Sequence, residues 1–158
     1  MFISEYSSPI GQIILRADNA ALTGLWFEGQ KHFPVLDNEI KNSEHGVLLL
    51  AKRVLDEYFF KGNISTYIPL SFSGTDFQKR VWQSLSHIPF GTVVSYSDVA
   101  KKVGCSSVRA VANAVSRNPI SIIIPCHRVV GKNGTLTGYA GGLDKKVWLL
   151  MHEGVDIK

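Results

Sequence analysis

One cysteine and the residues that follow it are the strongest candidates for chemistry in this sequence. Cys126 is followed directly by His127 and Arg128. A thiol beside an imidazole can become a nucleophile, because a basic neighbour lowers the pKa of the thiol and raises the fraction that is thiolate. Adjacent residues of a strand point to opposite faces, so we expect His127 to act on the thiol through a water molecule or a turn. Glu153 is the candidate third member that orients the imidazole.

The apolar residues before the cysteine predict where it lies. Residues 122–124 are all isoleucine, and three β-branched residues in a row favour a buried strand. Pro125 ends the pairing of this strand because proline has no N–H to donate. We therefore expect Cys126 at a strand end, inside the protein. Buried cysteines are ordinarily inert, so the neighbours of this one must decide whether it reacts.

Length and composition indicate a globular protein with a substantial core. The chain has 158 residues, of which 45% are hydrophobic and 10% aromatic, enough for one compact domain or two small ones. The first residues lack the basic segment and apolar stretch of a signal peptide, and no run approaches the roughly 18 apolar residues of a membrane span. Cys105 and Cys126 are too few for a disulfide framework. These features predict a cytoplasmic protein with reduced thiols and no membrane partner.

Charge is distributed unevenly along the chain. Residues 1–74 hold 6 Lys/Arg and 8 Asp/Glu, whereas residues 75–158 hold 11 and 5. A basic second half fits a polyanionic partner such as nucleic acid, although solvated lysines alone can give the same asymmetry. We expect the lysines of this half to be mostly solvated, with one or two of them at phosphates; they are Lys101, Lys102, Lys132, Lys145 and Lys146.

The first half predicts a small sheet covered by a helix. Three β-rich segments separated by turns predict an antiparallel meander, at residues 2–7, 11–17 and 20–27. Residues 28–42 are expected to form a loop, and apolar residues at helical spacing predict a helix that opens at Ser43 and stops at Gly62. Residues 63–73 are typical of a connector with a short extended piece. This boundary gives a supporting domain at residues 1–72 and a second domain at residues 73–158.

The second half is predicted to be mostly helical. Three helices are expected, each with a Ser or Thr cap: from Thr75 to residues 88–91, from Ser95 to Gly104, and from Ser106 or Ser107 to Ser116. The last two surround a glycine-containing turn, which is the helix-turn-helix arrangement. That arrangement is also common in folds that never touch DNA.

The residues after the cysteine predict a hairpin and a final helix. Asn133-Gly134 lies between the β-rich residues 129–130 and 135–137, which favours a tight hairpin. A helix-turn-helix followed by a hairpin resembles a winged helix. Residues 138–142 form a glycine-rich loop, and residues 143–152 have the pattern of an amphipathic helix.

The second of the two short helices is the candidate recognition element. Its inward stripe is predicted to be Val108, Val111, Ala112 and Val115. The outward face then combines small residues with polar ones, so a partner can approach closely and arginine can pair with phosphate. The outward residues are Arg109, Ala110, Asn113, Ala114 and Arg117.

Several motifs of the second half resemble those of one known family and occur in its order. The five residues from Pro125 to Val129 resemble the active-site motif of the O6-alkylguanine-DNA alkyltransferases, also called methylated-DNA–protein-cysteine methyltransferases. The other matching motifs are Thr75-x-Phe77-Gln78-x-x-Val81-Trp82, Ile88-Pro89-x-Gly91-Thr92-Val93-x-Ser95-Tyr96, Arg109-Ala110-Val111, Arg117-Asn118-Pro119 and Gly138-Tyr139-x-Gly141-Gly142-Leu143 through Trp148-Leu149-Leu150-x-His152-Glu153-Gly154. The match covers nearly all of Thr75 to Gly154 and is highly specific.

The resemblance implies an α+β fold. A small N-terminal antiparallel sheet with a helix, in an RNase H-like layout, would support a C-terminal winged helix-turn-helix domain that binds DNA and accepts the alkyl group. The first half resembles the family only in this layout. Between Tyr96 and Arg109 the chain is one residue shorter than the family pattern, and Cys105 falls in the shortened turn. The family docks the recognition helix in the minor groove, whereas helix-turn-helix geometry alone favours the major groove.

The resemblance also implies an activity. An alkyl group would pass irreversibly from O6 of guanine, and from O4 of thymine, in double-stranded DNA to Cys126 after the nucleotide flips out, and the monomeric protein would be consumed. His127 would deprotonate Cys126 through water and Glu153 would polarise His127. Tyr96 would help to protonate the departing guanine, and Asn118 would hold the turn between the recognition helix and the active site.

Further roles follow from the same resemblance. Arg109 would fill the place of the flipped nucleotide, backbone groups of Cys126, Val129 and Ala140 would read the guanine edge, and Tyr139 would line the pocket. The residues expected at DNA are Arg109, Ala110, Asn113, Ala114, Arg117 and Arg128. A thiolate displacement needs no metal. Some relatives carry zinc in the first domain, but that half has no cysteine here, so we expect neither metal nor cofactor.

Two other kinds of function fit part of the sequence. Some relatives bind alkylated DNA without repairing it, but they lack the acceptor cysteine that is present here as Cys126. A cysteine hydrolase or a winged-helix regulator is the other alternative. Hydrolases generally bring the histidine from far along the chain and need an oxyanion hole, for which the sequence gives no separate signal.

Overall fold

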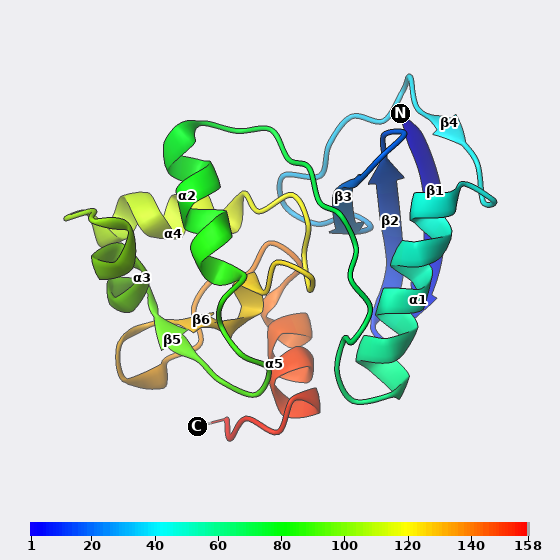
Figure 1. Cartoon of the computed structure of the whole chain (residues 1–158). Helices are drawn as coiled ribbons and strands as arrows, with labels where there is room; N and C mark the ends of the chain where they lie inside the picture. Colours follow the sequence, from blue (N-terminus) through cyan, green and yellow to red (C-terminus); the bar gives the residue numbers. More distant parts are fainter. Residues whose placement is uncertain (158) are drawn as a thin grey trace. The chain divides into compact units, whose positions relative to one another are not determined.

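The computed structural model describes residues 1–157 and contains both helices and sheets (Figure 1). The chain divides into two compact units, Met1–Phe72 and Ser73–Lys158. Each unit has its own sheet and its own helices. Within residues 1–157, the helices are too short or too polar for any of them to cross a membrane.

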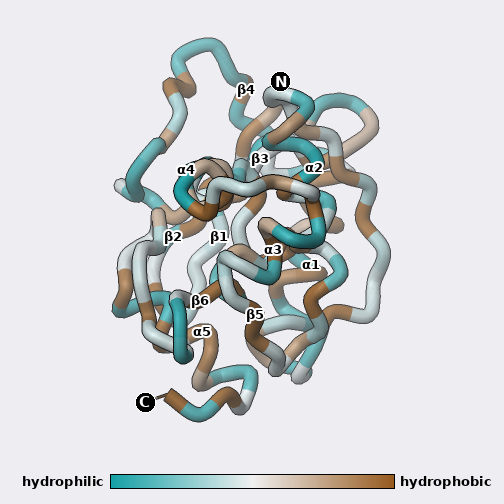
Figure 2. The backbone as a smooth tube through the Cα atoms, turned by 90° about the vertical axis from the view of Figure 1, so that its left-hand side faces the viewer, coloured by the Kyte–Doolittle hydropathy of each residue, from teal (hydrophilic) through white to brown (hydrophobic). Residues whose placement is uncertain are grey.

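The first unit is built on a four-stranded sheet with the order β3-β2-β1-β4. β1 (Phe2–Ser8), β2 (Gly11–Ala17) and β3 (Leu22–Phe27) form an antiparallel meander, which confirms the three predicted strands. β4 (Ile40–Lys41) pairs in parallel with β1. The prediction of a loop at these two residues is wrong. A strand of two exposed residues has no alternation of polar and apolar side chains from which it could be predicted. The rest of the segment before β4 is irregular and mostly hydrophilic (Figure 2).

The helix α1 (Gly46–Phe60) covers one face of this sheet (Figure 1). It begins three residues after the predicted Ser43, since His45 takes the N-cap position. The Tyr6 hydroxyl of β1 donates a hydrogen bond to Asp56 at 2.7 Å. The helix buries its inward stripe against the strands and completes the core of the unit, with Leu48, Ala51, Val54, Leu55 and Tyr58 all fully buried.

A buried glutamate fastens the connector to this first unit. Glu57 Oε1 accepts hydrogen bonds from the backbone N–H groups of Ser65 and Thr66 at 3.1 and 2.9 Å, and Oε2 accepts the Thr66 hydroxyl at 2.6 Å. Farther along, Leu70 forms a parallel bridge with Leu22. The predicted short extended piece is therefore present and continues the sheet. The bonds from Thr66 lower the pKa of Glu57 to about 2.

The second unit packs α2 (Asp76–Leu85), α3 (Tyr96–Val103) and α4 (Val108–Ser116) against one another (Figure 1). The caps of these helices confirm the predicted starts. Thr75 and Ser95 form capping boxes with the residues three positions later, and the Ser107 hydroxyl accepts the Ala110 N–H. Gly104 ends α3 in the left-handed conformation, with φ of 71°, which glycine adopts without strain.

Residues 122–124 do not form the predicted strand. Their hydrogen bonds are local, since the Ile124 N–H donates to the Ile120 carbonyl at 3.0 Å and the Cys126 N–H donates to the Ile124 carbonyl at 2.8 Å. Ile122 has a φ of 70°, which excludes strand geometry. Ile122 and Ile124 are buried. The isoleucine run therefore indicates burial correctly but not a strand.

The predicted hairpin after the cysteine is wrong as well, although its turn is right. Asn133 and Gly134 have φ values of 59° and 77°, the positive pair that an Asn-Gly turn requires. However, β6 (Val129–Val130) pairs in parallel with β5 (Val94–Ser95). Residues 135–137 form no strand. Across the turn the Gly131 N–H donates to the Thr135 carbonyl at 2.7 Å, but no strand follows, so the antiparallel wing is absent from residues 129–137.

Candidate active site

Cys126 lies inside the second unit. It opens a single 3-10 turn, Cys126–Arg128, which the Val129 N–H closes by donating to the Cys126 carbonyl. The residue is only 5% exposed. The predicted interior position is correct, but the cysteine sits in a helical turn and not at a strand end. The expectation that Cys126 and His127 point to opposite faces of a strand therefore does not apply to this turn.

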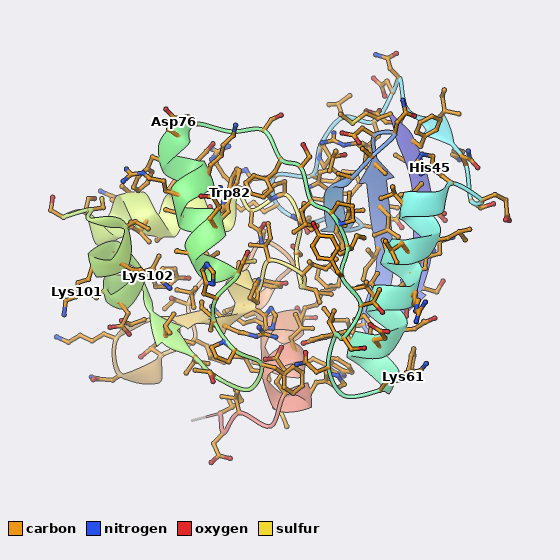
Figure 3. The ribbon with its side chains drawn as sticks, viewed as in Figure 1. His45, Lys61, Asp76, Trp82, Lys101 and Lys102 are labelled. Atoms are coloured by element: carbon orange, nitrogen blue, oxygen red, sulfur yellow. The ribbon has the colours of Figure 1, made fainter. Side chains whose placement is uncertain are left out.

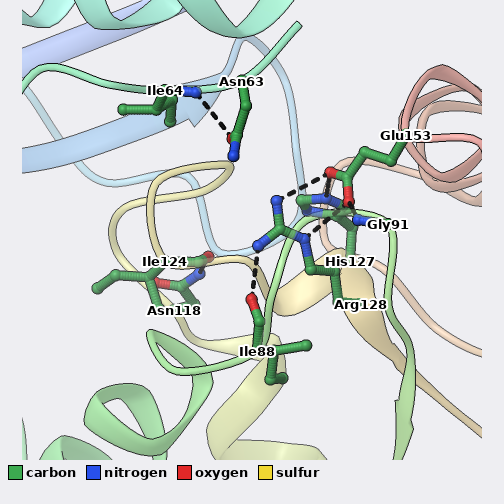
Figure 4. Close-up of polar contacts among 9 residues, drawn as sticks. All are labelled: Asn63, Ile64, Ile88, Gly91, Asn118, Ile124, His127, Arg128 and Glu153. Carbon is green, nitrogen blue, oxygen red and sulfur yellow. Dashed lines mark hydrogen bonds and ion pairs between the residues drawn. The ribbon is translucent and has the colours of Figure 1, made fainter.

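His127 is held by a carboxylate at the end of α5 (Leu143–His152). His127 Nε2 lies 2.6 Å from Glu153 Oε2, and both side chains are fully buried (Figure 4). Because a carboxylate only accepts hydrogen bonds, the proton resides on Nε2. Nδ1 is then the nitrogen that can take up a proton. Glu153 stands where the predicted orienting residue must stand.

Arg128 completes this buried cluster. Its Nε and Nη2 donate to the two oxygens of Glu153 at 2.8 and 3.1 Å, and its Nη1 donates to the Ile88 carbonyl at 2.7 Å (Figure 4). The Gly91 N–H donates to Glu153 Oε1 at 3.0 Å. The carboxylate thus joins the turn at 126–128, the segment at 88–91 and the end of α5. Since Arg128 is 7% exposed and paired inside the protein, its predicted contact with DNA is wrong.

The cluster keeps Glu153 ionised and His127 neutral. Burial alone would disfavour the carboxylate, but hydrogen bonds from His127 and Arg128 outweigh it and lower the pKa of Glu153 to about 2. Burial lowers the pKa of His127 below its ordinary value, against the opposing effect of Glu153. A neutral imidazole can accept a proton near neutral pH, so this histidine is suited to be a base.

The thiol of Cys126 is not activated at rest. Burial raises the pKa of Cys126 above that of a free thiol, and this effect exceeds the opposing influence of Asn118 and of the positive charge of Lys146. From the sequence we expect a lowered pKa for the Cys126 thiol, because a neighbouring His⁺ would favour the thiolate. A neutral, buried imidazole cannot do so. The thiol therefore needs a base at the moment of reaction.

Asn118 holds the turn that leads to the cysteine. Its Nδ2 donates to the Ile124 carbonyl at 2.7 Å (Figure 4). Its Oδ1 accepts the Ile120 N–H at 3.0 Å. The side chain is buried, with the residue 4% exposed. One amide thus spans both ends of the turn at 120–124, immediately after α4. This placement fits the role that the family resemblance gives to Asn118.

A buried lysine that the sequence analysis missed also lies in this site. Lys146 of α5 is 0% exposed, so the prediction that it is solvated is wrong. A signal was available, because Lys146 precedes the buried Leu149, Leu150 and Glu153 by three, four and seven positions, which puts it on the inward face. Its Nζ lies 5.9 Å from the centre of the Tyr96 ring. Burial raises the pKa of Tyr96, whose hydroxyl therefore stays protonated and donates to the Thr137 carbonyl at 3.4 Å.

Comparison with known proteins places this geometry in a family. A family model described as "6-O-methylguanine DNA methyltransferase, DNA binding domain" matches residues 76–155. The methylated-DNA–protein-cysteine methyltransferase of Methanosarcina acetivorans is 44% identical over 157 residues, which cover 98% of this chain and 99% of that protein. This chain belongs to the methylated-DNA–protein-cysteine methyltransferase family. The constitutive methyltransferase of Bacillus subtilis is 41% identical, with 99% of this chain and 98% of that protein covered.

The fold of this methyltransferase agrees with its sequence. The crystal structure of Mycobacterium tuberculosis OGT in complex with DNA is similar with a TM-score of 0.87 and 37% identity, and the similarity covers 97% of this chain and 92% of that one. The mixed α+β fold and the family resemblance are thereby confirmed. The residues matched by the family model include Cys126, His127 and Glu153.

The helix α4 of the methyltransferase exposes a different set of residues from the one predicted. Arg109 and Asn113 are exposed as expected, and so is Arg117, which caps the end of the helix. Ala110 is half-buried. Ala114, however, is 2% exposed, and its carbonyl accepts the indole N–H of Trp82 at 2.8 Å. Ala114 therefore faces α2 and not a partner, while Val108, expected to be inward, is 42% exposed. The buried stripe of the helix is Val111, Ala114 and Val115.

The residues expected in the base pocket lie around β6 and the loop after it. Val129 is 0% exposed, and its carbonyl already accepts a hydrogen bond from Lys146 Nζ at 2.6 Å. Tyr139 and Ala140 are half-buried in the loop at 138–142. Among residues 1–157, no three His, Cys, Asp or Glu side chains gather as metal ligands would.

Proposed function

We propose that this methyltransferase removes alkyl groups from O6 of guanine and O4 of thymine in double-stranded DNA and keeps each group on Cys126. The observation that carries the proposal is the buried Cys126, followed in the chain by a neutral, buried His127 that Glu153 holds at 2.6 Å. A thiol, a base and an orienting carboxylate form a nucleophilic set. The relatives named for methylated DNA and an acceptor cysteine support the same chemistry.

The transfer is a displacement at carbon. His127 takes the Cys126 proton through a bridging water, and the thiolate attacks the alkyl carbon on O6. The sulfur–carbon bond forms as the carbon–oxygen bond breaks, and the electron pair of that bond stays on the guanine. The Tyr96 hydroxyl gives a proton to the guanine, and the proton held by His127 restores the tyrosine through solvent. The product is a thioether, which no group of this site reverses, so each molecule reacts once.

The nucleotide must leave the double helix for this reaction. O6 lies on the major-groove edge within the stack, and Cys126 is 5% exposed, so the alkyl carbon reaches the thiol only when the base is flipped out. Flipping costs a few kcal/mol, less for a badly paired base. Arg109, exposed in the first turn of α4, fills the vacated place and offsets part of this cost.

The DNA-facing surface is formed by the second unit, residues 73–158, while residues 1–72 support it. The exposed residues of α4 face the duplex through Arg109, Asn113 and Arg117, with Ala110 allowing close approach. Lys101 and Lys102 extend outward from the end of α3 and supply further phosphate contacts (Figure 3). The similarity to Mycobacterium tuberculosis OGT, which was crystallised in complex with DNA, supports this assignment. We infer that the protein acts as a monomer.

A labelled-transfer experiment tests the function directly. The protein is incubated with a duplex that carries one O6-methylguanine with a labelled methyl group, and label on the intact protein is counted. The expected result is one label per molecule, on the peptide that contains Cys126. Cys126→Ala should accept no label and still bind the duplex, whereas Cys105→Ala should behave like the unaltered protein. Binding without transfer would show an alkylated-DNA-binding module, and several turnovers per molecule would show a different enzyme.

A further inference from the structure

The ammonium group of Lys146 is enclosed by backbone carbonyls. Nζ donates to the carbonyl oxygens of Val129 at 2.6 Å, Thr137 at 2.9 Å and Gly138 at 3.2 Å. An ammonium group has three N–H donors, so three acceptors satisfy it completely. The side chain is 0% exposed. The transfer described above gives this residue no task.

The three carbonyls belong to the two segments that surround the proposed base pocket. Val129 begins β6 directly after the turn of Cys126. Thr137 and Gly138 lead into the loop that carries Tyr139 and Ala140. Lys146 therefore ties that loop to β6 from a rigid position on α5.

The charge of Lys146 also faces the thiol. Among the groups around Cys126, Lys146 lowers the pKa of the thiol, against the larger effect of burial. Tyr96 and Tyr139 face the same thiol and stay neutral, because burial raises the pKa of both. Burial lowers the pKa of Lys146 to about 8, so the group is still mostly charged at neutral pH. It is thus a fixed cation where a thiolate must form.

Stability alone does not explain a lysine at this place. Removing an ammonium group from water costs several kcal/mol unless its partners compensate for it, and an apolar side chain of similar length avoids that cost. Methionine has a similar length but supplies neither a positive charge nor N–H donors, so a role for lysine here must use the charge or the donors.

We propose that Lys146 is a positioning residue, which holds the loop at 137–140 against β6 in the shape that receives the flipped base and keeps a positive charge beside Cys126. The base-receiving part of this inference rests on the proposed function. The loop and the thiol can be examined without any DNA, so the two proposals fail separately.

The first test measures the reactivity of the thiol. Cys105→Ala is introduced in every protein, so that iodoacetamide reports only on Cys126, and the rate of alkylation is followed against pH. At pH 7, where Lys146 is mostly charged, Lys146→Met should slow alkylation by about tenfold, because a nearby positive charge that favours the thiolate is lost. Lys145→Met, on the adjacent position of the same helix, is the matched control and should leave the rate at pH 7 unchanged. Equal rates at pH 7 for the two variants would overturn the electrostatic part.

The second test measures the loop and the pocket. Amide hydrogen exchange at residues 137–142 should become about tenfold faster in Lys146→Met, which corresponds to about 1.4 kcal/mol of lost local stability, while α2 and α4 keep their protection. If the function holds, alkyl transfer from duplex DNA and from the free O6-methylguanine base should fall by similar factors, since the pocket and not the DNA contact is altered. Unchanged loop exchange, or transfer lost from duplex DNA alone, would contradict the loop-holding role.

A second pair of variants covers the case in which Lys146→Met does not fold. Lys146→Arg keeps the charge and Lys146→Gln removes it while keeping donors. At pH 7 the arginine variant should be alkylated at a rate close to that of the unaltered protein, and the glutamine variant should be about tenfold slower. Identical rates at pH 7 for arginine and glutamine would count against the proposal. Label transfer absent from the unaltered protein would instead refute the proposed function and leave the exchange and titration results to decide on Lys146.

Discussion

Glu153 and Arg128 form a two-pronged ion pair in the interior, with Nε–Oε1 at 2.8 Å and Nη2–Oε2 at 3.1 Å. Because an arginine is always charged, the negative charge of Glu153 is balanced without any contribution from His127. The imidazole can then bond to the carboxylate and remain neutral. This relationship reconciles a strongly ionised Glu153 with a histidine that is able to accept a proton.

Replacing the carboxylate should therefore damage both stability and transfer. Glu153→Gln leaves the Arg128 charge buried without a counter-ion, and breaking a buried pair in this way costs about 3–5 kcal/mol. It also removes the negative charge and one of the two acceptor oxygens that His127 and Arg128 share, so the His127 proton is no longer fixed on Nε2 and transfer to Cys126 should slow by at least about 100-fold. Urea unfolding and single-turnover labelling measure the two effects.

The control for this variant is Asp156→Asn, which removes an exposed carboxylate three residues later. It should stay within about 0.5 kcal/mol of the unaltered protein, as exposed substitutions usually do. If Glu153→Gln were equally mild, the buried pair would not hold the site together.

Acid should weaken the first unit through Glu57. Its folded-state pKa of about 2 lies below the ordinary value of 4.5 because of the bonds from Thr66 and Ser65. A group with a lowered pKa contributes stability that is present above its unfolded value and lost as the pH falls through the folded value. Glu57→Gln should therefore unfold at lower urea concentration at pH 7, and the difference from the unaltered protein should shrink between about pH 4.5 and 2.

Glu44→Gln gives the comparison for this pH dependence, since Glu44 is exposed before α1. Its unfolding midpoint should follow that of the unaltered protein at every pH. A Glu57→Gln deficit that stays constant down to pH 2 would show that packing, and not the charge of the carboxylate, supports the connector.

The sequence predicts local structure well where the signal is itself local. The capping residues Thr75, Ser95 and Ser107, and the left-handed Gly104, act within three or four residues of their own position, and all of them are correct. The family motif likewise identifies Cys126, His127 and Glu153, all of which are buried, and the structure brings His127 and Glu153 together.

Long-range partners are the part that local signals do not give. Arg128 is 25 residues from Glu153, its ion-pair partner, and nothing near Arg128 distinguishes a buried arginine from one that binds phosphate. Lys146 was missed because its residue type was given more weight than its place on the inward face of α5. The isoleucines at 122–124 indicate burial, but the turn they form depends on Asn118.

Removing that amide should loosen the approach to the cysteine. Asn118→Ala leaves the Ile120 N–H without its partner and leaves the Ile124 carbonyl with only the Cys126 N–H. A buried unsatisfied group costs about 1–3 kcal/mol. We expect a loss of about 1–3 kcal/mol in urea unfolding and faster hydrogen exchange at residues 120–126. Asn113→Ala, on the exposed face of α4, is the matched control and should be close to neutral in stability. Equal stability of the two variants would mean that the turn persists without the amide.

The most selective prediction for DNA repair concerns Arg109. If its side chain fills the place of the flipped nucleotide, Arg109→Ala should slow transfer from duplex DNA by about tenfold or more, which corresponds to about 1.4 kcal/mol of the flipping cost. Transfer from the free O6-methylguanine base needs no flipping, so its rate should change by less than about twofold. Single-turnover labelling with both substrates gives the ratio.

Arg117→Ala separates this role from simple attraction to phosphate. Arg117 follows α4 and is exposed, so its loss should weaken binding to damaged and undamaged duplexes alike and reduce the salt dependence of binding by about one phosphate contact. It should leave the rate at saturating duplex nearly unchanged, because a phosphate contact does not help the base to flip. An Arg109→Ala variant that loses affinity but keeps its saturated rate would behave like Arg117→Ala, and Arg109 would then have to be assigned to the phosphate backbone and not to the stack.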